Sequence, residues 1–254
     1  MKKICVFLFI AGFIAITAQA QESEKLTSKK GIPILPETGD WALGIDASPF
    51  FRYAGNMLSS ANNFVPTFGF TAQAPGAIYV KYQTTSKMAY RAIILIGAST
   101  ETEKDPPTTG DTPDKNIYSA LSIGLHLGIE KTLSERGRVL GYYGGMAGIT
   151  KTPYNDGINI GKYSYVDANN SDADYKLVGG NTISVSVGGF AGVEYFFAPK
   201  LSIGGEFGVE LMGSIQSERI QKRDNAPDAT IDYGSSEISL SNNASGSLVL
   251  SIYL

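Results

Sequence analysis

The chain has 254 residues, one histidine, one cysteine and a formal net charge of −3, with 21 basic against 24 acidic side chains. This balance argues against a nucleic-acid partner, because nucleic acids are bound through a surplus of Lys and Arg. A single histidine also excludes a histidine-rich metal site. After residue 20, no run of about 18 apolar residues occurs, so no membrane-spanning helix is expected there.

The first 20 residues have the three parts of a secretory signal peptide. Two lysines precede a long apolar run, and small residues then lead to a cleavage site near Ala20. We therefore expect a Sec-type signal peptide over 1–20, followed by a flexible periplasmic leader over 21–38. The only cysteine lies inside the signal peptide, so the mature chain is expected to carry neither a disulfide nor a lipid anchor.

After the leader, eight segments alternate between apolar and small or polar side chains with a period of two, which is typical of β-strands. Most exceed the roughly 5–6 residues usual in soluble sheets and reach the roughly 9–11 that cross a bilayer with tilt. One of them, 88–100, is apolar on both parities, so its facing stays open. The segments are 39–50, 77–84, 88–100, 116–132, 139–151, 181–197, 201–216 and 237–254.

The connections between these segments alternate between short and long. The short ones are turns near 85–87, 133–138 and 198–200, and the long ones are polar loops at 51–76, 101–115, 152–180 and 217–236. Alternate connections of an up-and-down barrel emerge on opposite sides of the membrane. The sequence therefore predicts an all-β fold over 39–254: an eight-stranded antiparallel up-and-down transmembrane β-barrel. A soluble β-sandwich or lipocalin-type barrel is the alternative.

The last segment ends in a glycine, Gly246, followed by alternating apolar residues up to Tyr253 and Leu254. This ending is similar to the signal by which the barrel assembly machinery takes up its clients, although it finishes on leucine with the aromatic residue penultimate. With the strand rhythm, it makes 39–254 resemble the small outer-membrane β-barrel families related to the OmpA transmembrane domain, of the Bacteroidetes type. The resemblance implies an integral outer-membrane protein of a Gram-negative cell envelope and no particular activity.

The inward parity of the predicted strands gathers charged side chains. An eight-stranded barrel has an interior just wide enough to be filled by side chains, so these charges are expected to form a polar core. The alternative is an ion or proton path, which would make the protein a narrow, porin-like channel for small solutes or ions. The expected interior cluster is Asp46, Lys81, His126, Glu130, Glu194, Glu206 and Glu210, and Arg91 is left open as a second cationic partner.

The single histidine, His126, is the only candidate for a His-dependent acyl hydrolase or transferase of the outer membrane. Ser122 shares its face but lies about 13 Å along the strand. No Gly-x-Ser-x-Gly signature surrounds any serine. We therefore expect no enzyme, and we assign no catalytic, cofactor-binding or metal-binding residue.

The loop 152–180 carries four tyrosines among aspartates, a composition typical of surfaces that bind proteins or glycans. These are Tyr154, Tyr163, Tyr165 and Tyr175. A solvated loop is the alternative, and cation binding by the Asp-rich run 167–174 is a further one, although the run lacks the glycine and terminal glutamate of an EF-hand. The sequence thus predicts a structural, adhesive or complex-subunit role through long extracellular loops. The expected partners are outer-membrane lipid, the barrel assembly machinery during biogenesis, and a protein or glycan at the loops.

Overall fold

The computed structural model describes residues 26–47, 70, 76–106, 113–153, 162–166, 174–223 and 226–254. The expected signal peptide, 1–20, lies outside these residues. All secondary-structure elements in these residues are β-strands, so the all-β prediction is confirmed. None of the residues described belongs to a helix with the length and apolar character needed to span a membrane.

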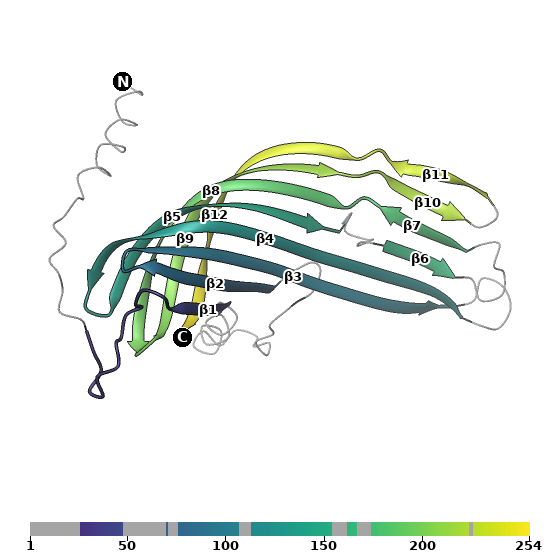
Figure 1. Cartoon of the computed structure of the whole chain (residues 1–254). Coiled ribbons are helices and arrows are strands. Elements are labelled where there is room, and N and C mark those ends of the chain that lie inside the picture. Colours follow the sequence, from purple (N-terminus) through teal and green to yellow (C-terminus); the bar gives the residue numbers. More distant parts are fainter. Residues whose placement is uncertain are drawn as a thin grey trace, which may run out of the picture.

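The described residues form twelve strands in one antiparallel sheet (Figure 1). They are β1 (Trp41–Asp46), β2 (Gly76–Thr85), β3 (Met88–Asp105), β4 (Asp114–Arg136), β5 (Val139–Thr152), β6 (Lys162–Val166), β7 (Tyr175–Gly179), β8 (Thr182–Ala198), β9 (Leu201–Gln216), β10 (Arg219–Arg223), β11 (Ala226–Asp232) and β12 (Ser235–Tyr253).

Eight of these strands, β1–β5, β8, β9 and β12, lie where the sequence predicts strands. The expectation that 152–180 and 217–236 are only loops is wrong, because β6, β7, β10 and β11 lie there. Each of these four has 5 to 7 residues, and Asn, Asp and Gly surround them, so turn signals dominate the local sequence. Neighbouring strands supply the pairing that makes such short segments extended.

Eight strands pair in a cycle. Their order in the sheet is β4-β3-β2-β1-β12-β9-β8-β5, and β5 pairs again with β4. The register is staggered around this cycle: the successive partners of Leu250 on β12, taken through all eight strands, return to β12 at Ile238. The cycle of strands therefore closes with a net shift along β12, rather than on the residue where it began.

The remaining strands continue the sheet at one end, and we call this part the sheet extension: 98–105 of β3, 114–119 of β4, and strands β6, β7, β10 and β11. Its order is β3-β4-β6-β7-β10-β11. In the extension, β6 takes the place beside β4 that β5 holds further down, with Tyr118 opposite Tyr163. Figure 1 shows these strands reaching away from the end where the short turns lie.

The two faces of the eight cyclic strands differ in character. On β4, Leu121, Ile123, Leu125, Leu127 and Ile129 are exposed, whereas Ser122 and Glu130 on the other face are buried. The alternation in the sequence predicts this division. The structure also gives the facing of β3, which the sequence left open: Arg91 is buried, while Ile94 and Ile96 are exposed.

The segment 26–38, expected to be a flexible leader, contacts the short-turn end of the sheet. Ile34 is only 2% exposed and packs in a cluster with Leu140, Tyr142, Phe196 and Tyr253. Its carbonyl oxygen accepts a hydrogen bond from the backbone N–H of Lys200 in the β8–β9 turn. Lys200 also forms an ion pair with Asp40, just before β1. This segment therefore covers the base of the apolar cluster.

Candidate functional site

Charged side chains from five strands, β2, β3, β4, β8 and β9, meet in one ion-pair network on the buried face. The ammonium nitrogen of Lys81 lies 3.1 Å from Glu130 Oε1 and 3.2 Å from Glu194 Oε2. The Arg91 guanidinium donates to both carboxylate oxygens of Glu206, at 2.6 and 3.3 Å, and lies 3.4 Å from Glu130. Lys81 and Arg91 are register partners on β2 and β3, so two adjacent cations face three carboxylates.

Aromatic and hydroxyl side chains surround this network. Tyr253 donates its hydroxyl to Glu194 at 3.0 Å, and Ser202 donates to the same carboxylate. The Lys81 ammonium lies 4.7 Å from the ring centre of Tyr142, and the Arg91 guanidinium lies 4.1 Å from that of Phe190. Charges that are buried in this way must be paired and hydrogen-bonded to be tolerated. The network therefore has the character of a cross-linked polar core.

Four of the seven expected interior residues, Lys81, Glu130, Glu194 and Glu206, are thus brought together. The contacts described above do not include the other three. His126 instead forms a hydrogen bond with Thr150 Oγ1, at 3.1 Å, and its ring lies against Gly148. Asp46 ends β1 opposite Val249, and Glu210 lies opposite Gly188 on β8.

The sequence left open whether Arg91 belongs to this site, because the apolar character of 88–100 on both parities hid its facing. The hairpin register supplies the missing signal. A short turn at 86–87 places Arg91 directly opposite Lys81, and directly opposite residues share a face of the sheet. Tyr142 and Tyr253 were not assigned to this site from the sequence, because their contacts with Lys81 and Glu194 join strands far apart in the chain.

A second candidate site lies on the sheet extension, where four tyrosines from β4, β6 and β7 form a row that we call the tyrosine face: Tyr118, Tyr163, Tyr165 and Tyr175. The ring centres of Tyr118 and Tyr163 are 5.1 Å apart, and Tyr175 lies 5.7 Å from Tyr163 and 5.5 Å from Tyr165. Three of the four tyrosines expected at a contact surface therefore lie together. Tyr154 falls outside the described residues.

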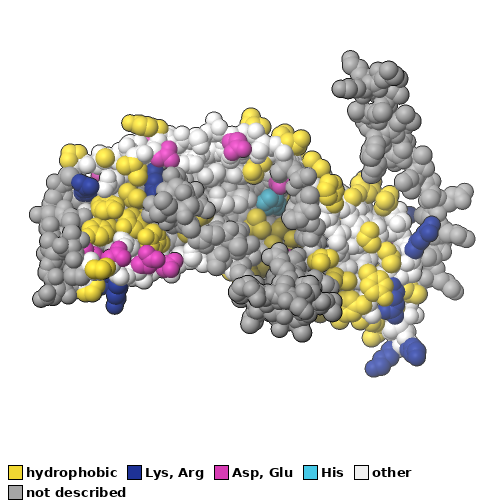
Figure 2. Space-filling view, turned by 180° about the vertical axis from the view of Figure 1, so that it is seen from behind, with side chains coloured by type: hydrophobic (Ala, Val, Ile, Leu, Met, Phe, Trp, Pro, Cys, Tyr) yellow, Lys and Arg dark blue, Asp and Glu magenta, His cyan; other side chains and the backbone are white. Residues whose placement is uncertain are grey.

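Charges border the tyrosine face on two sides. On the β3 side, Glu101 and Glu103 are exposed in the strand next to Tyr118. On the β10 side, the Arg223 guanidinium lies 5.9 Å from the ring centre of Tyr175. Figure 2 shows hydrophobic side chains gathered at this end of the molecule, with acidic side chains along the lower border of the patch. Tyr163 is buried, so the face offers the partly exposed rings of Tyr118, Tyr165 and Tyr175 for stacking. The neighbouring carboxylates can accept hydrogen bonds.

Buried polar side chains of β4, on the same face as Tyr118, hold two of these tyrosines by hydrogen bonds. The Tyr165 hydroxyl donates to Asp114 at 2.9 Å, and the Tyr163 hydroxyl donates to Asn116. Both Asp114 and Asn116 are buried. These hydrogen bonds hold the rings in fixed positions, which reduces the conformational entropy that a binding surface would lose on contact.

The tyrosine face gives an expected pH dependence. Burial, and then a hydrogen bond with Tyr175, raises the pKa of Tyr163 above its usual 10.0. The folded state therefore holds this proton more tightly than the unfolded state, so stability present below about pH 10 is lost as the pH rises further. We expect Tyr163→Phe to remove a late-ionising step from an alkaline titration followed by tyrosinate absorbance. An unchanged late step in Tyr163→Phe would contradict this assignment.

No group of three or more His, Cys, Asp or Glu side chains in the described part of the chain is arranged to hold a metal ion. The Asp-rich run 167–174 lies outside the described residues, except for Asp174. Comparison with models of protein families, with curated proteins and with solved structures finds no match to this chain. The functional argument therefore rests on the geometry of the chain itself.

Proposed function

We propose that the protein is an integral outer-membrane β-barrel, formed by β1–β5, β8, β9 and β12 as eight antiparallel up-and-down strands. The cycle of pairings supports this proposal, because a sheet whose last strand pairs with its first has no open edge. The staggered register supports it as well, since strands that close into a barrel must tilt and shift along one another. In hydrocarbon, closure satisfies every backbone hydrogen bond of the strands.

The distribution of side chains carries the proposal. A soluble protein buries its aliphatic side chains and exposes its charges, whereas here Leu125, Val187 and Phe207 are exposed while Arg91 and Glu194 are buried. The exposed set covers neighbouring strands as a continuous belt, and soluble monomers rarely expose an apolar patch of such extent. A belt of this kind is what a bilayer would cover.

The exposed aromatic side chains near the short turns lie where one interface of the proposed membrane barrel would be. Trp41, Tyr90, Tyr143, Tyr195 and Phe197 are all exposed at this end of the strands. Aromatic rings are enriched at the two interfaces of membrane barrels. By the usual arrangement of such barrels, the short turns would face the periplasm, and the sheet extension would lie outside the cell.

The role that fits this arrangement is structural or adhesive, with the sheet extension as the contact surface for a protein or glycan. The ion pairs between Lys81, Arg91 and their carboxylates join β2, β3, β4, β8 and β9 across the interior, which favours a filled core over an open pore.

A narrow channel for small solutes or ions is the alternative function. Reconstituted wild-type protein is expected to give no single-channel current in a planar bilayer, and a stable conductance would favour the channel.

The proposed barrel and its location can be tested together by SDS gel electrophoresis of the detergent-purified protein, heated and unheated. A folded membrane barrel resists SDS, so the unheated sample is expected to migrate faster. Proteinase K applied to whole cells beforehand is expected to cut only in the sheet extension and in the long connections, including 51–76, and to leave the short turns intact. A chain that fractionates with soluble periplasmic proteins and shows no heat-dependent shift would overturn the proposal.

A further inference from the structure

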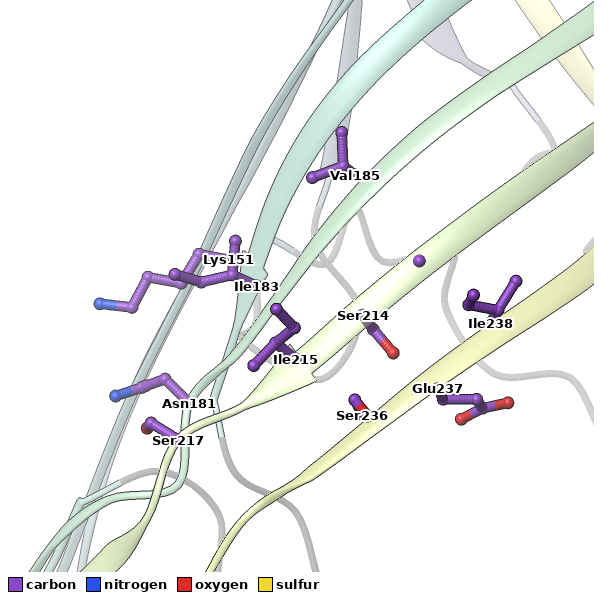
Figure 3. A pocket seen from close by; sticks show the side chains of 11 residues that line it. Lys151, Asn181, Ile183, Val185, Ser214, Ile215, Ser217, Ser236, Glu237 and Ile238 are labelled. Atoms are coloured by element: carbon purple, nitrogen blue, oxygen red, sulfur yellow. The ribbon is translucent and has the colours of Figure 1, made fainter.

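An apolar groove lies on the exposed face of the sheet, where β8, β9 and β12 arch toward the extension. It has a volume of about 1020 Å³ and is lined by residues of β5, β8, β9 and β12 (Figure 3). This volume is at the upper end of the roughly 300–1,000 Å³ usual for small-molecule sites. The groove is continuous with the exposed aliphatic belt, because Ile183 and Val185 belong to both.

A glycine forms the floor of the groove. Gly213 lies on β9 between Val185 of β8 and Ile238 of β12, its two register partners. A Cβ atom added at Gly213 would meet no atom within 4 Å, so the space above it is open. Ile183 and Ile215, also register partners, stand beside this space. The result is an apolar channel along the surface that a flexible hydrocarbon chain could occupy.

Polar groups gather at one end of the groove. Lys151 lies near the end of β5, Asn181 just before β8 and Ser217 just after β9. Figure 3 shows the nitrogen atoms of Lys151 and Asn181 pointing in the same direction, away from the apolar side chains. The carboxylate of Glu237 lies at the opposite end of the view. The cation and the amide therefore stand where the aliphatic belt ends and the extension begins.

We propose that this groove binds one phosphate-bearing lipid of the outer leaflet, with an acyl chain over Gly213 and the phosphate at Lys151. The inference rests on the proposed function, because it requires the belt to lie in a membrane. Two observations select this occupant. Aliphatic side chains surround Gly213 in the groove, and one end carries a cation and an amide at the level where lipid headgroups would lie, while the one carboxylate of the lining, Glu237, lies at the opposite end. A protein partner would not require an apolar groove that ends in a cation at the level of the lipid headgroups.

Lipid binding can be measured by native mass spectrometry of the folded protein in detergent, with dioleoylphosphatidylglycerol or dioleoylphosphatidylcholine added. Gly213→Leu fills the groove floor and is expected to weaken binding of the anionic lipid about tenfold, the effect of losing roughly two buried methylene groups. Gly205→Leu is the matched control. It lies on the same face of β9 outside the groove, where an added Cβ would meet only Leu248 at 4.0 Å.

Lys151→Gln tests the headgroup contact. We expect about fivefold weaker binding of the phosphatidylglycerol, as for loss of a solvent-exposed ion pair, and a smaller change for the zwitterionic lipid. Lys131→Gln, at an exposed lysine near the opposite end of the belt, is the control and is expected to leave the binding of both lipids unchanged.

Each variant is first checked for the heat-dependent gel shift. Equal lipid binding by wild type and Gly213→Leu, or an equal loss in Gly205→Leu, would overturn the groove assignment while leaving the barrel intact. Absence of the gel shift in the wild type would overturn the barrel and the groove together.

Discussion

Leu125→Arg is expected to destabilise the folded protein in a bilayer by about 2–4 kcal/mol, the range for a cation on the lipid face near the midplane of a membrane barrel. Leu125 is 44% exposed and stands in the middle of the aliphatic row on β4. Its replacement by arginine would force a charge into hydrocarbon. The measurement is the urea midpoint of unfolding in phosphatidylcholine vesicles, followed by the heat-dependent gel shift.

Leu133→Arg is the control for that experiment. Leu133 lies on the same strand and is similarly exposed, at 51%, but it stands near the short turn, beyond the aliphatic row. Its cost is expected to be about 0–1 kcal/mol, as for a charge near the interface. In a soluble protein both substitutions would place a charge in water, so equal and small effects would contradict the membrane barrel.

Arg91→Ala is expected to lower the free energy of unfolding by about 3–5 kcal/mol, because it leaves buried carboxylates without their cation. Arg91 is buried, makes two hydrogen bonds to Glu206 and lies close to Glu130. Loss of the guanidinium would also open space beside Phe190. The same urea titration measures the change.

Arg136→Ala, at an exposed arginine beside the β4–β5 turn, serves as the comparison and should change stability by no more than about 0.5 kcal/mol. A double variant, Arg91→Ala with Glu206→Gln, is expected to recover part of the loss, because removing both charges leaves no unpaired carboxylate at that position. If Arg91→Ala were as stable as Arg136→Ala, the ion pairs would not be what stabilises the interior.

The period-two alternation is strong enough to predict the long strands and most of their facing from sequence. On β4, the separation of Leu125 and Leu127 from Ser122 and Glu130 follows directly from the backbone geometry of a strand. The short turns follow from local residues too: Gly137 has a φ of +59°, a conformation that glycine adopts without steric cost. These features depend on neighbours in the chain.

The features that were missed depend on residues far apart in the chain. The pairing of Tyr163 with Tyr118 requires β6 to lie beside β4, a contact that no local pattern encodes. Arg91 meets Glu206 across a separation of 115 residues. Ile34 likewise lies in a buried cluster with residues of three strands that are distant in the chain, β5, β8 and β12. Local composition could therefore indicate a polar interior and an aromatic surface, but it could not select which residues meet.

The pairing of β1 with β12, with Ala42 opposite Tyr253, has a kinetic consequence. These strands are the first and last of those described, so the seam between them can close only after every intervening strand has found its register. Contacts of such long sequence separation slow folding, because loop-closure entropy is lost before the contact forms. In the proposed membrane barrel, two strands would carry unsatisfied backbone groups until that seam closes, and hydrocarbon does not tolerate such groups. A folding catalyst that shelters both free edges would then relieve this step, and a chain truncated before β12 would fail to persist in the membrane.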